Sequence, residues 1–204
     1  MISADRVLSE QQLSKLLKII KVEKEKSILA VQGSSKRNPK EVRNIIDYFL
    51  FRIISVTGLR ISEALTLRWS DVHTEFLVIQ KQNSKNGRKG TVYFGDKASS
   101  LFDELRRLKS ETIKRGNPDL VFSFTGIVPS RSYAHSRFKK WLSLAGLPLQ
   151  LSIHSLRHTY ATLCLDKGLS LAFVKNNLRH QSVASTSAYL HLTQESRQKI
   201  KSLF

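Results

Sequence analysis

Cysteine is nearly absent from this chain of 204 residues, in which Cys164 is the one thiol. A single cysteine excludes an internal disulfide framework and is typical of a protein from a reducing compartment. Long hydrophobic runs are missing as well, because no apolar stretch approaches the roughly 20 residues that a membrane-spanning helix needs. The opening residues, MISADRVLSEQQ, contain no apolar segment of the signal-peptide type. We therefore expect a cytoplasmic protein without membrane partners.

Motifs of several common enzyme classes are also missing. The chain has no glycine-rich phosphate loop, which argues against a nucleotide-driven enzyme. It has neither a D-x-D motif nor a cluster of acids that would suit a two-metal site. His154 and His158 have the spacing of zinc ligands on a helix, but the sequence offers no H-E-x-x-H motif to complete such a site. We expect no metal and no cofactor.

Acidic residues are scarce, since 34 lysines and arginines stand against 16 aspartates and glutamates, for a net charge of +18. A surplus of this size attracts polyanions, of which nucleic acid is the usual one. The plainer alternative is a ribosomal or generally adhesive basic protein. Because the basic residues are spread along the chain, they favour a folded domain with a wide basic face over a disordered basic arm.

The apolar pattern predicts a mainly helical domain with one small antiparallel sheet, an α+β fold. Ser9 and Gln12 have the spacing of a capping box ahead of an apolar stripe, which predicts a helix over 8–20. The polar stretch 21–38 predicts a loop. Asn38 and Pro39 then match an N-cap and a first helical residue, and Gly58 is a natural end for the buried helix that follows.

The rest of the chain predicts a hairpin followed by helices. A short helix is expected within 59–69, and β-rich runs at 76–80 and 91–94 flank Asn86-Gly87, a strong hairpin signal. The segment 81–89 contains four basic residues and no acid. Further helices are expected at about 97–115, 131–145, 154–167, 170–178 and 183–190, with a short last one in 193–204.

Two stretches contain basic side chains that could bind an anion. Arg60 follows Gly58 at a helix boundary, with Glu63 one turn on, although an ordinary surface salt bridge explains this pair equally well. In IHSLRHT, His154 and Arg157 are three residues apart and would share a helix face. Together they form a donor pair suited to phosphate. An arginine paired with an acid and a core histidine is the plainer interpretation.

A third stretch, NNLRHQSVASTSAYLH, adds His180 and Tyr189, and a tyrosine in such a place is more often a core residue. Together, the three stretches fit one reaction, the attack of an alcohol on a phosphodiester. Two arginines and histidines can hold the non-bridging oxygens as their negative charge builds. Tyr189 can be the nucleophile, and a lysine on the basic hairpin can protonate the leaving oxygen.

Five motifs, in this order and spacing, resemble those of the tyrosine recombinase (phage integrase) family. They are TGLRISE with Arg60 and Glu63, NSKNG with Lys85, HSLRHT with His154, Arg157 and His158, LRH with His180, and TSAYLH with Tyr189. The resemblance runs from about Leu8 to about Leu192. One departure is Arg179, which stands where the family pattern has glycine. Because arginine does not readily adopt a positive φ, either the local turn differs or Arg179 contacts a phosphate.

The resemblance implies the fold of the DNA breaking-rejoining enzymes and a mechanism. Tyr189 would attack the scissile phosphate and form a 3′-phosphotyrosyl bond. Arg60 and Arg157 would hold that phosphate, and Lys85 would protonate the 5′-oxygen.

Supporting roles also follow from the resemblance. His154 and His180 would add hydrogen bonds and assist proton transfer, Glu63 would support Arg60, and His158 would be mainly structural. Further contacts to DNA are expected from four basic residues, Lys81, Arg88, Lys89 and Arg179.

As for organisation, we expect one catalytic domain over 1–204, with a helix and linker in 1–38, the core in 39–192 and a tail in 193–204. The family's usual N-terminal core-binding domain is expected to be absent. The implied partners are double-stranded DNA and other copies of the chain, in a tetrameric synapse associated with the nucleoid. The apolar residues of the tail would dock on a neighbouring subunit or pack within the same one.

Two rival functions are a type IB topoisomerase and a regulatory DNA-binding protein of the same fold that does not cut. The sequences of the TGLR and LRHT motifs favour a recombinase over a topoisomerase. Loss of catalysis is disfavoured because the residues for it are all present, namely Arg60, His154, Arg157, His180 and Tyr189. A metal-dependent nuclease is disfavoured by the missing acidic cluster.

Overall fold

The computed structural model describes residues 6–32, 38–83, 89–112, 117–124, 129–179 and 200. Its elements in chain order are α1 (Glu10–Gln32), α2 (Pro39–Thr57), α3 (Ile61–Leu65), η2 (Trp69–Asp71), β1 (Phe76–Ile79), η3 (Lys81–Asn83), β2 (Gly90–Tyr93), α4 (Asp96–Thr112), α5 (Arg131–Leu144), α6 (Ile153–Asp166) and α7 (Leu171–Asn177). The prediction of a mainly helical fold with a small antiparallel sheet is confirmed.

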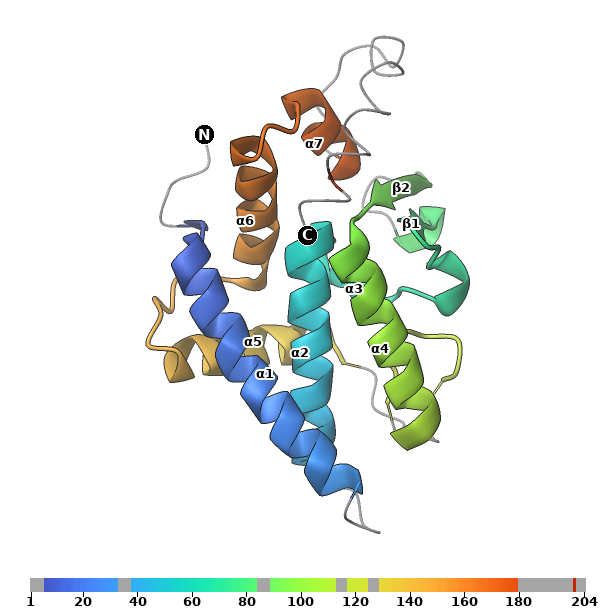
Figure 1. Cartoon of the computed structure of the whole chain (residues 1–204), viewed down its shortest axis with the longest axis vertical. Coiled ribbons are helices and arrows are strands. Elements are labelled where there is room, and N and C mark those ends of the chain that lie inside the picture. The colour runs from blue at the N-terminus through green and yellow to red at the C-terminus, as the bar shows by residue number, and fades with distance from the viewer. Residues whose placement is uncertain are drawn as a thin grey trace.

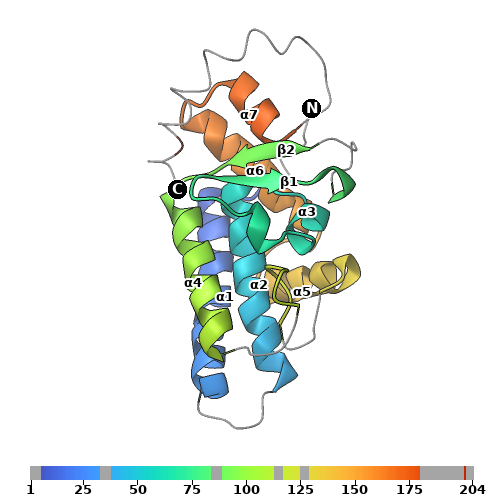
Figure 2. The same cartoon turned by 90° about the vertical axis from the view of Figure 1, so that its right-hand side faces the viewer.

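The long helices α1, α2 and α4 run lengthwise through the molecule, and α5 crosses beside them (Figure 1). The turned view shows the β1–β2 hairpin across one end of these helices, with α6 and α7 on the same side (Figure 2). Helix α2 is central, because it contacts α1, α4, α5 and α6. In the described part of the chain, none of the helices combines the length and the apolar character that crossing a membrane requires.

Helix α1 continues to Gln32, so the prediction of a loop from residue 21 was wrong. The buried face of this helix includes Lys24, Ser27 and Val31, and its polar members hide the helical period in the sequence. Lys24 is only 5% exposed; its ammonium group donates a 2.8 Å hydrogen bond to Glu104 of α4 and lies 4.4 Å from the ring centre of Tyr48. Partners far along the chain therefore stabilise a lysine at a core position.

The two ends of α2 are formed as the sequence predicts. The side chain of Asn38 accepts a hydrogen bond from the backbone N–H of Lys40, and Pro39 occupies the first turn. The helix ends at Gly58, whose φ of 68° is left-handed. A Cβ at Gly58 would lie 2.5 Å from Cδ1 of Tyr160, so glycine is needed both for the backbone angle and for the close approach of α6.

The predicted hairpin strands pair antiparallel, with Phe76 opposite Tyr93 and Ile79 opposite Gly90. The turn predicted at Asn86-Gly87 lies outside the described residues. The helices predicted at about 97–115, 131–145, 154–167 and 170–178 correspond to α4, α5, α6 and α7. The helix predicted at 183–190 lies outside the described residues, and of the tail only Ile200 is described, buried beside Tyr160 and Phe173.

Candidate active site

Arg60 and the buried Glu63 form an ion pair where α2 turns into α3. Arg60 directly precedes α3, and its backbone N–H donates to Oε2 of Glu63 at 2.8 Å. Its guanidinium donates to Oε1 of Glu63 at 2.9 Å. The Glu63 side chain has 0% exposure and that of Arg60 has 18%. The pair is therefore not the exposed salt bridge that its spacing alone allows, and Glu63 fixes both the backbone and the side chain of Arg60.

Arg179, at the end of α7, is a second partner of Glu63. Its Nη2 donates to Oε2 of Glu63 at 2.5 Å, and its side chain is 11% exposed. Its φ is 54°, so the backbone does adopt the left-handed conformation that a glycine would adopt more easily. The Arg179 side chain passes over Gly90 of β2. A Cβ added at Gly90 would lie 2.5 Å from Cδ of Arg179. The glycine on the hairpin thus makes room for the arginine.

Arg157 projects inward from α6 and is 2% exposed. Its Nη1 donates to the carbonyl of Gly58 at 2.5 Å, and its Nη2 donates to the carbonyl of Leu178. These carbonyls lie at the C-terminal ends of α2 and α7, which attract cations. Burial, together with Arg60 and Arg179, lowers the pKa of Arg157 to about 9, so the guanidinium is still charged at neutral pH.

Arg60 and Arg179 share the single carboxylate of Glu63, and the charge of this carboxylate also acts on the nearby guanidinium group of Arg157; we call these four side chains the arginine cluster. Burial would raise the pKa of Glu63, but the charge of Arg179 and the hydrogen bonds from Arg60 and Arg179 outweigh it and hold that pKa below its ordinary value. Three positive charges against one negative charge leave a buried excess of cations. Such a site stabilises an added anion, and guanidinium forks fit phosphate oxygens.

His154 and His158 lie on α6 next to the arginine cluster. His154 is exposed, and its ring stands edge-on to that of His158, with the ring centres 4.6 Å apart. Burial, with the charges of Arg157 and Arg6, lowers the pKa of His158, which favours its neutral form. The i,i+3 spacing predicts one shared face for His154 and Arg157, whereas the structure places the first at the surface and the second in the interior.

Asn177, which no sequence motif singled out, joins three elements of this region. Its side-chain oxygen accepts from the backbone N–H of Tyr93 at 2.7 Å, and its amide donates to the Tyr93 carbonyl and to the Tyr160 hydroxyl, each at 3.0 Å. The edge of β2 is therefore held to α6 and α7. No signal in the sequence indicated this role, because Asn177 directly follows two other polar residues, Lys175 and Asn176, at the end of α7.

Comparisons with known proteins agree with this geometry. Residues 6–196 match the profile of the phage integrase family. The chain belongs to that family. It is 31% identical over 172 residues to the tyrosine recombinase XerD of Corynebacterium glutamicum, an alignment that covers 84% of this chain and 55% of the relative. The chain thus spans about half the length of the curated relatives that it matches.

Solved structures of phage integrase family members have the same fold. A crystal structure of the XerH site-specific recombinase bound to its difH substrate, before cleavage, superposes with a TM-score of 0.62 at 26% identity, covering 87% of this chain and 47% of XerH. The crystal structure of the XerA recombinase superposes with a TM-score of 0.66 at 21% identity, covering 95% of this chain and 63% of XerA. This likeness supports the fold alone.

Within the phage integrase fold, the structure brings some of the predicted site residues together and leaves others apart. Arg60, Glu63 and Arg157 come together in the arginine cluster, whereas Lys81 and Lys89 lie exposed on either side of the hairpin turn. Four of the predicted site residues lie outside the described residues, namely Lys85, Arg88, His180 and Tyr189. Their roles, and the DNA contacts expected of Lys81, Lys89 and Arg179, remain predictions.

Arg179→Gly, which restores the glycine of the family pattern, is expected to destabilise the chain. Glycine adopts the left-handed φ without the strain of about 1–2 kcal/mol that arginine has there. The substitution also removes an ion-pair partner of the buried Glu63, and this loss is the larger effect. We expect a net loss of about 1–2 kcal/mol in the free energy of unfolding, measured by urea denaturation. Arg179→Asn is the control, because asparagine tolerates this φ and lacks the charge. An Arg179→Gly variant as stable as the parent would mean that the ion pair contributes no more than the strain energy of the left-handed φ, about 1–2 kcal/mol.

Proposed function

We propose that this chain is the catalytic part of a site-specific tyrosine recombinase, which cleaves and rejoins double-stranded DNA through a 3′-phosphotyrosyl intermediate. The observation that carries the proposal is the excess of positive charge around the buried Glu63 in the arginine cluster, whose residues come from three of the family motifs. The XerH recombinase, captured in a pre-cleavage complex with its difH substrate, supports the same class of substrate for this chain.

The proposed reaction begins with the hydroxyl oxygen of Tyr189, which attacks the scissile phosphorus. The bond from phosphorus to the 5′-oxygen breaks as the bond to Tyr189 forms. The tyrosine proton passes to a neighbouring base, a role in which His154 and His180 would assist, and Lys85 protonates the leaving 5′-oxygen. Rejoining is the reverse reaction with a 5′-hydroxyl as the nucleophile. Because the phosphotyrosine keeps the energy of the broken bond, the cycle requires no external energy source.

Arg60 and Arg157 would hold the phosphate while its charge increases. Each guanidinium has five N–H donors, and the described side-chain contacts use two on each residue. The remaining donors would hold the non-bridging oxygens of the phosphate. Two backbone carbonyls fix Arg157 in advance, so little reorganisation is needed when the transition state forms.

The proposed partners are double-stranded DNA and further copies of this chain, four of which would assemble around two DNA sites near the nucleoid. The net charge of +18 supports binding to DNA, since contacts with phosphates release counterions. The rivals are a DNA-binding protein of the same fold that does not cut and a type IB topoisomerase. A metal-dependent nuclease gains no support, because the described ranges contain no group of three His, Cys, Asp or Glu side chains placed to bind a metal ion.

Tyr189→Phe is expected to abolish the covalent protein–DNA complex and to leave DNA binding intact. Phenylalanine keeps the ring and lacks the attacking oxygen. The measurement is a denaturing gel after incubation with nicked DNA carrying a candidate site, in the presence of EDTA. Tyr133→Phe is the matched control, because Tyr133 lies in α5 and its buried hydroxyl has no hydrogen-bond partner among the described residues. That variant should form the covalent band like the parent.

A covalent band that persists in Tyr189→Phe would mean that another residue is the nucleophile. If the parent gives no band even when a wide set of sites and longer family members are supplied, the non-cutting DNA-binding protein becomes the better interpretation. Resealing of a nicked site without exchange between two different DNA molecules would favour the topoisomerase.

A further inference from the structure

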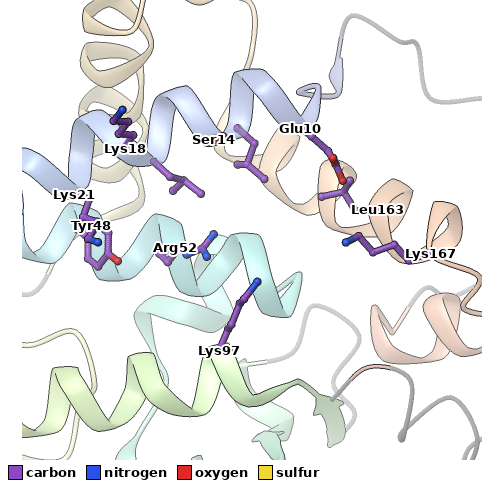
Figure 3. A pocket seen from close by; sticks show the side chains of 11 residues that line it. Glu10, Ser14, Lys18, Lys21, Tyr48, Arg52, Lys97, Leu163 and Lys167 are labelled. Atoms are coloured by element: carbon purple, nitrogen blue, oxygen red, sulfur yellow. The ribbon is translucent and has the colours of Figure 1, made fainter. Parts of the chain in front are cut away.

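A second region that suits an anion lies away from the arginine cluster. A pocket of about 560 Å³ opens between α1, α2 and α6, with Lys97 of α4 at its edge (Figure 3). Its volume is within the range of small-molecule sites, about 300–1,000 Å³. None of the residues that line it belongs to the family motifs or to the arginine cluster.

Basic side chains dominate this pocket. Five of them line it, Lys18, Lys21, Arg52, Lys97 and Lys167, and the only carboxylate among the lining residues is that of Glu10. The lining thus has an excess of positive charge within one pocket, contributed by side chains from four helices. Figure 3 shows the charged ends of Arg52, Lys97 and Lys167 pointing toward one another from α2, α4 and α6. An anion bound among these cations would gain Coulomb energy from each of them.

Arg52 is the innermost of these cations. It is half-buried, and burial lowers its pKa. Among the described residues, neither Arg52 nor Lys97 forms an ion pair with a carboxylate, and Lys21 reaches only the exposed Glu25, at 3.8 Å. Within the described part of the chain, Arg52 is thus a half-buried guanidinium at the pocket wall that pairs with no carboxylate.

The pocket is separate from the catalytic face. Leu163 of α6 lines the pocket and lies nine positions after His154. At about 3.6 residues per turn, nine positions rotate a side chain to the opposite side of the helix. A ligand in the pocket would therefore not occupy the site of the scissile phosphate.

We propose that this pocket binds a small phosphorylated anion that has two or more phosphates. A concave pocket between helices suits a compact ligand better than the extended backbone of a duplex. The concentration of cations suits adjoining phosphates better than the carboxylates of an acidic peptide, each of which has a single charge. Leu13, Leu17 and the ring of Tyr48 provide an apolar wall for an organic body attached to the phosphates.

Isothermal titration of the whole chain with inorganic tripolyphosphate, at constant ionic strength, tests this proposal. Arg52→Gln and Lys97→Gln are each expected to weaken binding by about tenfold, equivalent to about 1.4 kcal/mol. Arg52→Lys should recover part of the affinity. The matched control is Arg107→Gln, since Arg107 is exposed on α4 and does not line the pocket. Melting temperatures without ligand identify any variant that folds poorly; because Lys97 is exposed, its variant remains informative if Arg52→Gln unfolds.

Three further results would overturn the proposal. If Arg60→Gln abolishes tripolyphosphate binding and Arg52→Gln does not, the anion binds the arginine cluster. If Arg107→Gln weakens binding as much as Arg52→Gln, the attraction comes from the net charge alone. If the binding of random-sequence duplex DNA or of a glutamate-rich peptide depends on Arg52 and the binding of tripolyphosphate does not, the pocket binds a macromolecule instead. Binding that requires Arg52 and Lys97 but neither Arg60 nor Arg107 would establish the site, whether or not the chain cleaves DNA.

Discussion

Replacing Glu63 with glutamine is expected to destabilise the chain by about 2–4 kcal/mol at neutral pH. Glutamine keeps the shape of the buried side chain but leaves the partly buried guanidinium groups of Arg60 and Arg179 without their carboxylate. Urea denaturation of the parent and the variant would measure the difference. Glu111→Gln is the matched control, because Glu111 is exposed on α4. It should change stability by less than about 0.5 kcal/mol.

The effect of Glu63 should also depend on pH in a defined direction. Its pKa is lower in the folded chain than the ordinary value of 4.5, so the folded state binds this proton more weakly than the unfolded state does. The stabilisation is therefore fully present above pH 4.5 and is lost as the pH falls through the lower, folded-state pKa. The stability difference between the parent and Glu63→Gln should shrink in acid. A difference that stays constant down to about pH 3 would contradict the ion-pair interpretation.

Arg157→Lys is expected to slow formation of the covalent complex by a factor of about 100–1,000, the usual effect of losing one preorganised donor to a developing anion. Lysine keeps one positive charge but cannot donate to the carbonyls of Gly58 and Leu178 while presenting a planar fork to a phosphate. The rate should be measured in a single turnover on nicked DNA. Because Arg157 would be one of many contacts with phosphates, DNA affinity should change by less than about tenfold.

The same experiment on Arg107→Lys serves as the control for the chemistry of the substitution, since Arg107 is exposed on α4. That variant should cleave at the parental rate. If Arg157→Lys cleaved as fast as the parent, a planar fork at this position would be unnecessary. If it lost DNA binding and cleavage in the same proportion, Arg157 would act in binding DNA and not selectively in the transition state.

Features that depend on neighbouring residues were predictable from the sequence. Asn38 caps α2, Gly58 ends it with a left-handed φ, and the capping box of Ser9 and Gln12 forms at the start of α1. The interactions that decide these positions involve residues no more than about four apart, so the sequence pattern contains both partners. The family could be predicted from the sequence for a different reason. Each motif alone is a weak signal, but the full set of motifs in order is specific to one family.

The tertiary structure decided the features whose partners lie far apart in the chain. The sequence predicted a loop where α1 continues, because the buried Lys24 depends on Glu104, 80 residues away. It left open whether Arg179 changes the turn or contacts a phosphate, because its partner Glu63 is 116 positions away.

What the sequence by itself determined is therefore the fold class, most of the helix ends and the family. Only the folded chain decided which guanidinium groups share one carboxylate and which cations meet in the pocket at Arg52. The physical reason is that the energy of a buried charge depends on the groups that packing places around it, and spacing along the chain does not record them.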